Sequence, residues 1–272
     1  MKTDVDILFL TGDHPRHIYF ANKIIENFPN SFIAIQKREP HILKPGDFYN
    51  GNLLSKNEKK LWNLHFEERA DTEKRWFGTS DLLEKDYFID EEKLYSDKYE
   101  KDFITLHPKI LLSYGCGIIG EHTTKVGQLA NLNFHGGLSP WYKGTATHFW
   151  PSYLLEPEFT GVAIHELSSK IDSGPLVHQV SAKLVKGDGI HDLSSRVIQK
   201  AIDECIRLLK NIIKNGRYQS IPQGKTGKLF LNSDWNVTHL KLVYEMFENR
   251  IVDWRLNESS PKKIELFKAN LK

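Results

Sequence analysis

A strand–helix–strand pattern at the start of the chain constrains the fold more than any other feature. The apolar run 5–10 is typical of a buried strand, apolar residues recur at helical intervals over 18–28, and a second apolar run covers 32–35. Because this order makes a right-handed crossover between parallel strands, it predicts an α/β fold with a mostly parallel sheet. The connecting turn at Gly12 lacks the repeated glycines of a dinucleotide-binding or P-loop fingerprint, so it is weak evidence for phosphate binding.

Further elements follow along the chain. In the charge-rich stretch 38–101, charged residues alternate in sign around apolar ones, which predicts one long amphipathic helix with a solvated face. The other expectations are strands at 110–114, 161–167, 176–180 and 228–231, and helices within 118–130, 145–155, 191–215 and 237–249. We therefore expect a Rossmann-like, mostly parallel sheet flanked by helices in a main domain over 1–215, followed by a short α+β C-terminal extension over 216–272.

The composition favours a globular protein without a strong charge preference. Lys and Arg number 37 against 35 Asp and Glu, a balance that gives no general drive toward nucleic acid or membrane. The two cysteines lie far apart and no C-x-x-C is present, so neither a disulfide framework nor a structural zinc site is expected. The twelve histidines form no H-E-x-x-H or comparable spacing, and we expect no metal.

The chain passes from its first residues directly into an apolar strand, without a basic leader or a cleavage site. No segment approaches the roughly 20 apolar residues that span a bilayer. We therefore expect a cytoplasmic protein with no membrane and no nucleic-acid partner. The sequence leaves the oligomeric state open, a homodimer included.

The most informative polar residues are Asn133 and His135, which emerge from an apolar segment into a glycine-rich turn. Alternate side chains of a strand share a face, so these two would project together while Leu132 and Phe134 pack on the other side. An amide can donate hydrogen bonds to an oxygen that gains negative charge, and an imidazole can hold or pass a proton near neutral pH. The pair suits attack on a carbonyl, with a carboxylate from another loop orienting the imidazole.

The sequence offers no obvious enzymatic nucleophile for this chemistry. No serine lies in a G-x-S-x-G elbow, and neither Cys116 nor Cys205 has an evident partner. We infer that the attacking atom belongs to a substrate, which favours direct acyl transfer. A lone N-x-H would more often contain a structural histidine with satisfied hydrogen bonds, but here it is part of a longer string that continues to an acidic turn at Asp172.

That string resembles the folate-dependent formyltransferases, a family that includes methionyl-tRNA formyltransferase, glycinamide ribonucleotide formyltransferase and bacterial sugar N-formyltransferases. The resemblance covers 109–179 well and the first strand loosely. The chain has G-G-L-S-P where the tRNA enzyme usually has S-L-L-P after the histidine, a departure that bears on substrate class more than on chemistry. The matching residues are Asn133, His135, the Leu138-Ser139-Pro140 turn, Lys143-Gly144, and Asp172 with Gly174.

The resemblance implies 10-formyltetrahydrofolate as the formyl donor and an amine as the acceptor. Asn133 would polarise the formyl oxygen, and His135 would accept a proton or stabilise charge. Asp172 would hold His135 or relay the proton through water. The division of acid and base roles between His135 and Asp172 stays open, because interacting groups titrate as a unit.

The resemblance also implies binding residues. Main-chain groups of the turn after strand 110–114 and of the loop before Asp172 would hold the pterin ring, and His165 would support the folate loop, with a structural histidine as the alternative. Arg16 and His17 could meet an anionic substrate, with solvated surface groups as the alternative. The cofactor-binding candidates are Tyr114, Gly115, Cys116, Gly117, Ile118, Ile119, Ser169, Lys170 and Ile171, and the substrate-binding candidates are Arg16, His17, Tyr142, Lys143 and Gly144.

We therefore expect an N-formyltransferase whose acceptor is a small amine, a nucleotide-linked amino sugar in the first instance. The short tail leaves no room for the extra nucleic-acid-binding barrel that the resemblance implies for a methionyl-tRNA formyltransferase. The alternatives are a methionyl-tRNA formyltransferase-like enzyme and a non-catalytic folate-binding module. The Gly12 turn disfavours glycinamide ribonucleotide as the acceptor, because it lacks a glycine-rich phosphate loop.

Overall fold

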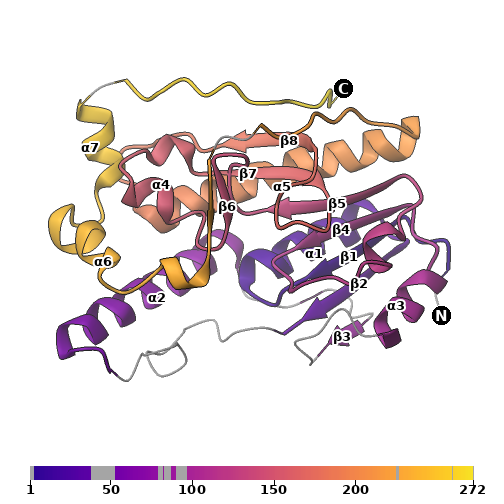
Figure 1. The fold of residues 1–272 in the computed structure, drawn as a ribbon, viewed down its shortest axis with the longest axis horizontal. Helices are drawn as coiled ribbons and strands as arrows, with labels where there is room; N and C mark the ends of the chain where they lie inside the picture. The colour runs from indigo at the N-terminus through magenta and orange to yellow at the C-terminus, as the bar shows by residue number, and fades with distance from the viewer. Residues whose placement is uncertain are drawn as a thin grey trace.

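The computed structural model describes residues 3–37, 53–78, 82, 87–89, 97–224, 227–258 and 260–271. Within these residues a seven-stranded sheet has the order β3-β2-β1-β4-β5-β7-β8 (Figure 1). Neighbouring strands from β3 to β5 are parallel, whereas β7 is antiparallel to both β5 and β8. The fold class predicted from the sequence is confirmed. The strands are β1 (Ile7–Thr11), β2 (Ser31–Gln36), β3 (Tyr87–Ile89), β4 (Ile110–Tyr114), β5 (Ala130–His135), β7 (Gly161–Glu166) and β8 (Leu176–Ser181).

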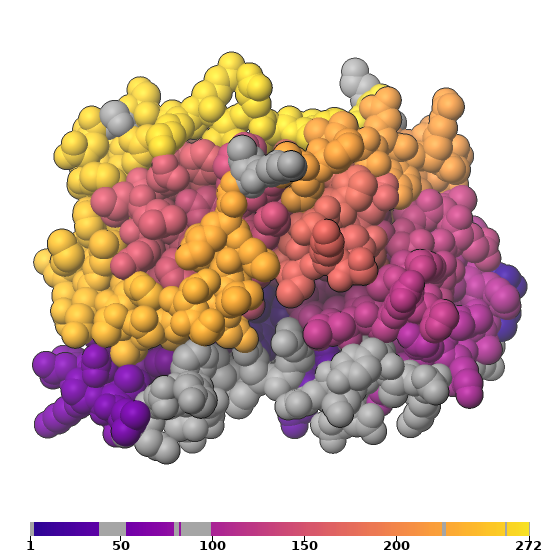
Figure 2. Space-filling view, viewed as in Figure 1, coloured from indigo at the N-terminus to yellow at the C-terminus, as the bar shows by residue number. Residues whose placement is uncertain are grey.

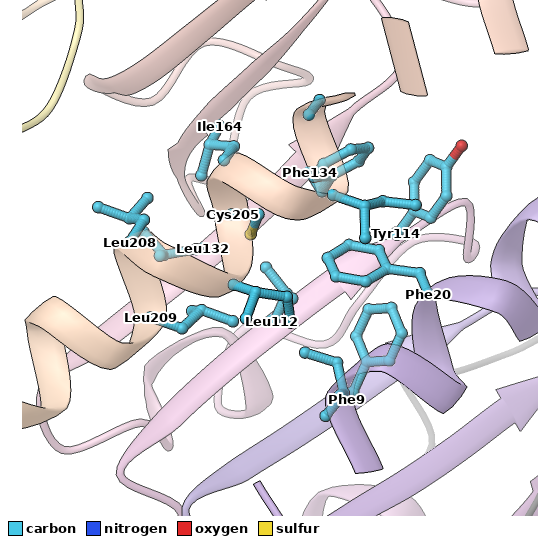
Figure 3. Close-up of a cluster of buried hydrophobic side chains, with 14 of the residues drawn as sticks. Phe9, Phe20, Leu112, Tyr114, Leu132, Phe134, Ile164, Cys205, Leu208 and Leu209 are labelled. Carbon is cyan, nitrogen blue, oxygen red and sulfur yellow. The ribbon is translucent and has the colours of Figure 1, made fainter. Parts of the chain in front are cut away.

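Helices cover both faces of the sheet. The side chains of β1, β4 and β5 that point to one face pack against α1 and α5, and those of β1 and β4 on the other face pack against α3. Figure 3 shows part of the first cluster, in which Phe134 of β5 lies near Phe20 of α1 and Leu132 faces α5. The helices are α1 (Pro15–Asn27), α2 (Lys56–Phe77), α3 (Asp97–Thr105), α4 (Trp150–Tyr153), α5 (Ile190–Asn215), α6 (His239–Lys241) and α7 (Ile251–Glu258).

The long helix α2 is shorter than the stretch 38–101 predicted for it. Ser55 begins it through a capping box, in which the Glu58 N–H donates to the Ser55 hydroxyl over 3.3 Å and the Ser55 N–H donates to the Glu58 carboxylate over 2.9 Å. Gly78 ends it. The prediction of a single helix was wrong, because β3 and α3 also lie within the stretch, and the rest of it falls outside the described residues.

The helix predicted within 118–130 is absent, and the segment contains only the 3-10 turn Thr123–Lys125 before β5 begins at Ala130. The Asn131 side chain accepts a hydrogen bond from the Gly127 N–H over 2.8 Å and donates to the Gly127 carbonyl over 3.0 Å. Both main-chain groups of Gly127 are therefore taken by a side chain that competes with a helix for them.

Two other predicted helices are smaller than expected. Within 145–155 only Trp150–Tyr153 is helical, because Pro151 has no N–H to donate and fits only the first turn. Within 237–249 the chain forms α6 and the π-helical turn Leu242–Met246, and it ends in left-handed residues at 248 and 249. The predicted helix 191–215 is confirmed as α5, which ends at the left-handed Gly216.

The segment after α5 returns to the main sheet. On the way, its short strand β9 (Lys228–Phe230) forms a separate two-stranded parallel sheet with β6 (Tyr142–Gly144), the strand that follows the turn after β5. Residues 260–271 then run along the β8 edge (Figure 1), where the Gln179 N–H donates to the Phe267 carbonyl over 2.9 Å and the Phe267 N–H donates to the Gln179 side chain over 2.7 Å. The predicted boundary between 1–215 and 216–272 stays a prediction.

Candidate active site

The end of β5 places Asn133 and His135 on one face of the sheet, as the alternation of the strand predicts. Leu132 and Phe134 are fully buried on the opposite face, where they join the cluster under α1 and α5 (Figure 3). Asn133 is half-buried and His135 is only 7% exposed. The hydrophobic anchors on one side therefore fix the direction of the polar pair on the other.

Asp172 lies in the loop between β7 and β8, in a left-handed conformation with φ of 45°. Its Oδ2 accepts a hydrogen bond from the Gly144 N–H over 2.9 Å. Gly174 lies against the main chain of Glu166, because an added Cβ would be 1.8 Å from the Glu166 carbonyl oxygen. The glycine two positions after the aspartate is therefore required for the loop to close over β7.

The amide, the imidazole and the carboxylate come together. His135 Nδ1 is 3.3 Å from Asp172 Oδ2, and Asn133 Nδ2 is 3.4 Å from Asp172 Oδ1. The carboxylate thus contacts both members of the pair, although it is 37 residues beyond His135 in the chain. The structure places the three predicted catalytic side chains within hydrogen-bonding reach, and their catalytic roles stay a prediction.

Two further side chains fix the orientation of the Asn133 amide. The Ser113 hydroxyl on the neighbouring strand β4 donates to Asn133 Oδ1 over 2.8 Å. His165 on β7 has its Nδ1 2.8 Å from the Glu166 carbonyl and its Nε2 3.2 Å from Asn133 Nδ2. In the neutral ring a proton on Nδ1 lets Nε2 accept from the amide, and Nε2 also lies 3.4 Å from Asp172 Oδ1, to which a protonated ring can donate. The amide oxygen is held by Ser113, and the amide hydrogens point toward His165 and Asp172.

Opposing effects set the charge states of the carboxylate and the imidazole. Burial alone would raise the pKa of Asp172, but the His135 and His165 rings and the Gly144 N–H outweigh it and lower the pKa to about 2. Burial lowers the pKa of His135 from its ordinary 6.5, while the Asp172 carboxylate acts in the opposite direction. At neutral pH the pair is therefore a carboxylate beside a neutral imidazole.

Both nitrogens of His135 face oxygen atoms. Nε2 is 3.2 Å from the Tyr142 carbonyl, and Nδ1 faces Asp172. A neutral ring can donate to only one of these oxygens, whereas a protonated ring donates to both. The surroundings of His135 therefore suit a ring that takes up a proton during a reaction.

Comparison with known proteins assigns the family. A family model described as "Formyl transferase" matches residues 52–208, more than half of the chain. The chain belongs to the formyl transferase family. The resemblance predicted from the sequence is thereby confirmed, and this formyltransferase has all three converging side chains within the matched region. No protein of curated function matches the chain in sequence.

Solved formyltransferases share the fold. A 4-N formyltransferase from Francisella tularensis has a TM-score of 0.55 at 14% identity, over 85% of this chain and 78% of that one. A sugar N-formyltransferase from a Shewanella species has a TM-score of 0.54 at 16% identity, over 84% and 78%. The formyltransferase PseJ from Anoxybacillus kamchatkensis, solved with UDP-4,6-dideoxy-4-formamido-L-AltNAc and tetrahydrofolate, has a TM-score of 0.51 at 18% identity, over 92% and 97%. At these identities the likeness concerns the fold alone.

The two turns predicted to hold a folate expose apolar side chains in this formyltransferase. Ile118, after β4, is 74% exposed, and Ile171, before Asp172, is 57% exposed. Ser169 and Lys170 are also exposed, whereas Cys116 is half-buried. Gly117 already uses its N–H, which donates to the Gln36 side chain over 2.7 Å. Gly115 and Ile119 lie in the same turn as Ile118, and Ile119 packs partly against the cluster beside α3.

Tyr114 has a different position from the one expected of a ligand-contacting side chain. It is 4% exposed, and its ring centroid lies 4.7 Å from that of Phe134 and 4.6 Å from that of His17. Burial raises the pKa of Tyr114 to about 12. As the last residue of β4 it points to the α1 face, so only its main chain can contribute to the turn.

Arg16 and His17 are not solvated surface groups, which was the alternative to substrate binding that the sequence left open. His17 is 4% exposed and lies between Gly12 and Gly115, where an added Cβ on either glycine would be 2.5 Å or less from a ring nitrogen. Arg16 pairs with Glu73 of α2 and is largely buried. Both residues follow β1, next to the turn after β4, where ligands of open α/β sheets bind.

The other predicted acceptor-binding residues lie around β6. Tyr142 is buried, its hydroxyl donates to Glu156 over 3.4 Å, and its ring stacks on Phe230 of β9. The Gly144 N–H is used by Asp172, so Gly144 positions the carboxylate. Lys143 is half-buried.

Figure 2 shows a hollow between the orange C-terminal segment and the salmon-coloured residues near 170, with indigo N-terminal atoms at its floor.

The sequence did not identify every residue that contacts the site. No sequence motif marked Ser113, because its contact with Asn133 depends on β4 and β5 being neighbours in the sheet. Gly137 was part of the glycine-rich turn, and an added Cβ there would be 2.5 Å from His135 Nε2. Gln223 lies near the end of the chain and contacts the Asp172 loop.

In the ranges described above, no group of three or more His, Cys, Asp or Glu side chains is arranged to hold a metal ion. Of the helices in that part of the chain, none combines the length and apolar character of a transmembrane span.

Proposed function

We propose that this formyltransferase transfers a formyl group from 10-formyltetrahydrofolate to the amine of a nucleotide-linked amino sugar. The observation that carries the proposal is the convergence of Asn133, His135 and Asp172 at the carboxyl end of β5. PseJ, which shares the fold, binds tetrahydrofolate and a UDP-linked formamido sugar, and this supports the choice of donor and acceptor.

The surroundings of the site fit a folate and an acceptor amine. The exposed Ile118 and Ile171 provide apolar contacts on the two turns that would flank the ring system. Among the described residues, the polar contacts of His135 are with the Tyr142 carbonyl and Asp172, and not with a serine or cysteine. Cys205 of α5 is fully buried, and burial raises the pKa of its thiol. The nucleophile is therefore the substrate amine.

The donor supplies the formyl carbon, whose bond to the donor nitrogen breaks as a bond to the acceptor nitrogen forms. The Asn133 N–H that faces Asp172 makes the longer of the two amide contacts, with N–O and N–N distances of 3.4 and 3.2 Å, so in the fixed amide it is the donor that a formyl oxygen can share as that oxygen gains negative charge. The His135–Asp172 pair accepts the proton that the amine loses. The protonated ring is stabilised by oxygens on both sides, and it gives its proton to the donor nitrogen, which leaves as the N–H of tetrahydrofolate.

The proposal is tested by incubating the purified protein with 10-formyltetrahydrofolate and a panel of UDP- and dTDP-linked amino sugars, and by weighing the products. A formamido sugar, formed only when both substrates are present, is the expected result. Formylation of methionyl-tRNA and of none of the sugars would contradict the acceptor. Tight folate binding without product from any amine or from water would instead support a non-catalytic folate-binding module.

A further inference from the structure

The segment that follows α5 returns to the loop that carries Asp172. Ile221 and Leu176, the first residue of β8, exchange both main-chain hydrogen bonds, with N–O distances of 2.9 and 2.7 Å. Burial and the neighbouring carboxylate of Glu166, the last residue of β7, raise the pKa of Tyr218 to about 12. Residues 218–223 therefore contact the ends of both strands that flank the loop. They lie beyond the residues 52–208 that match the family model.

Gln223 contacts the loop itself. Its Nε2 donates to the Asp172 carbonyl over 2.9 Å and to the Gly174 carbonyl over 2.7 Å. A carboxamide nitrogen has two hydrogens, so one side chain satisfies both carbonyls. These carbonyls flank Ser173, in the turn where Asp172 has its left-handed conformation. Such a conformation costs free energy in a residue other than glycine and persists only where its surroundings hold it.

We propose that Gln223 is a positioning residue that fixes the Asp172 main chain and thereby holds the carboxylate between Asn133 and His135. The two hydrogen bonds of Gln223 hold the loop from its main-chain side. The Gly144 N–H, 2.9 Å from Asp172 Oδ2, holds the carboxylate from the other side. The C-terminal segment is then part of the catalytic apparatus. The effect on turnover rests on the proposed function, whereas the effect on the position of the carboxylate does not.

The Ile221–Leu176 pair makes this role separable from a general structural one. That pair uses main-chain atoms only, so it anchors the segment whatever side chain stands at position 223. Gln223→Met removes both donors and preserves the length of the side chain. Gln219→Met makes the same change at an exposed residue of the same segment and is the matched control.

The first test needs no substrate. The exchange rate and NMR chemical shift of the Gly144 amide report whether Asp172 Oδ2 still accepts its hydrogen bond. In Gln223→Met we expect this amide to exchange at least about tenfold faster, in line with the loss of neutral hydrogen bonds, and its resonance to move. Gln219→Met should leave both unchanged. An unchanged Gly144 amide in folded Gln223→Met would overturn the proposal; if the Met variant does not fold, Gln223→Ala is measured in the same way.

The second test uses turnover. Gln223→Met should lower kcat about tenfold with a smaller change in KM, and Gln219→Met should match the wild type. In an Asp172→Asn background the Gln223 substitution should cost nothing further, because its effect passes through Asp172. Equal losses of kcat in both backgrounds would overturn the positioning role. If no formyl transfer is found with any amine, the proposed function fails while the Gly144 measurement still decides the role of Gln223.

Discussion

The Ser113 hydroxyl donates a hydrogen bond to Asn133 Oδ1 over 2.8 Å, across the neighbouring strands β4 and β5. An amide that is free to rotate by half a turn can present either its oxygen or its NH2 group to a ligand. The contact with Ser113 selects the orientation in which the NH2 group faces Asp172. In this orientation the NH2 group can donate a hydrogen bond to a substrate oxygen that gains negative charge.

Ser113→Ala should therefore lower kcat about fivefold to tenfold, the equivalent of about one neutral hydrogen bond, with little change in KM. Steady-state kinetics of the formyl transfer reaction measure this. Ser152→Ala is the matched control, because Ser152 is also buried and its hydroxyl has no hydrogen-bond partner among the described residues. Equal rates for Ser113→Ala and the wild type would show that the amide keeps its orientation without Ser113.

The two adjacent glycines after His135 should respond differently to substitution. In Gly137→Ala the new Cβ would be 2.5 Å from His135 Nε2 and 2.7 Å from Thr147 Cβ, so the imidazole must move. In Gly136→Ala the nearest atom, in the His148 ring, is 3.4 Å away, which is an ordinary contact. We expect formyl transfer to fall at least about tenfold in the first variant, since small displacements of reacting groups are costly. Similar rates for both variants would contradict this geometry.

Acidification should remove activity only below the ordinary titration range of histidine. Burial lowers the pKa of His135 below 6.5, so the neutral ring persists as pH falls through 6.5 and kcat/KM declines at lower pH. The pKa of Asp172, about 2, keeps the carboxylate ionised throughout. Because the carboxylate raises the pKa of His135, Asp172→Asn should lower it further. NMR titration of His135 in both proteins checks this, and a higher pKa in the variant would contradict the assignment.

Folding stability should also fall with pH. Burial lowers the pKa of His191, at the start of α5, to about 3, so the folded protein keeps this ring neutral. An unfolded chain takes up the proton near pH 6.5, and stability is therefore lost as pH falls from 6.5 toward 3, by up to about 1.4 kcal/mol per pH unit. Urea unfolding at several pH values should show a shallower loss for His191→Gln. The same slope for both proteins would mean that other groups account for the loss.

The sequence predicted the parts of the fold that depend on local periodicity. The alternation in β5 correctly placed Asn133 and His135 on one face, and the apolar spacing predicted α5. The helix expected within 118–130 was wrong, because the Asn131 side chain competes for the main chain of Gly127. That contact depends on where the next strand begins, which apolar spacing does not encode.

Contacts between distant segments account for what the sequence did not predict at the site. Ser113 meets Asn133 through the order of the strands, and Gln223 meets the Asp172 loop after α5 has crossed the sheet. The ring of Tyr114 points to α1 because of its register in β4, although its neighbours form the turn expected to bind folate. Sheet order and register, which are tertiary properties, decide all three.

The most direct test of the account is the rate of formyl transfer by the wild type and by Asn133→Ala, His135→Ala and Asp172→Ala under identical conditions, with folding checked by circular dichroism. We expect each substitution to slow transfer at least about a hundredfold, because each removes either an oxyanion donor or a member of the proton-accepting pair. A folded variant that transfers the formyl group at nearly the wild-type rate would contradict it.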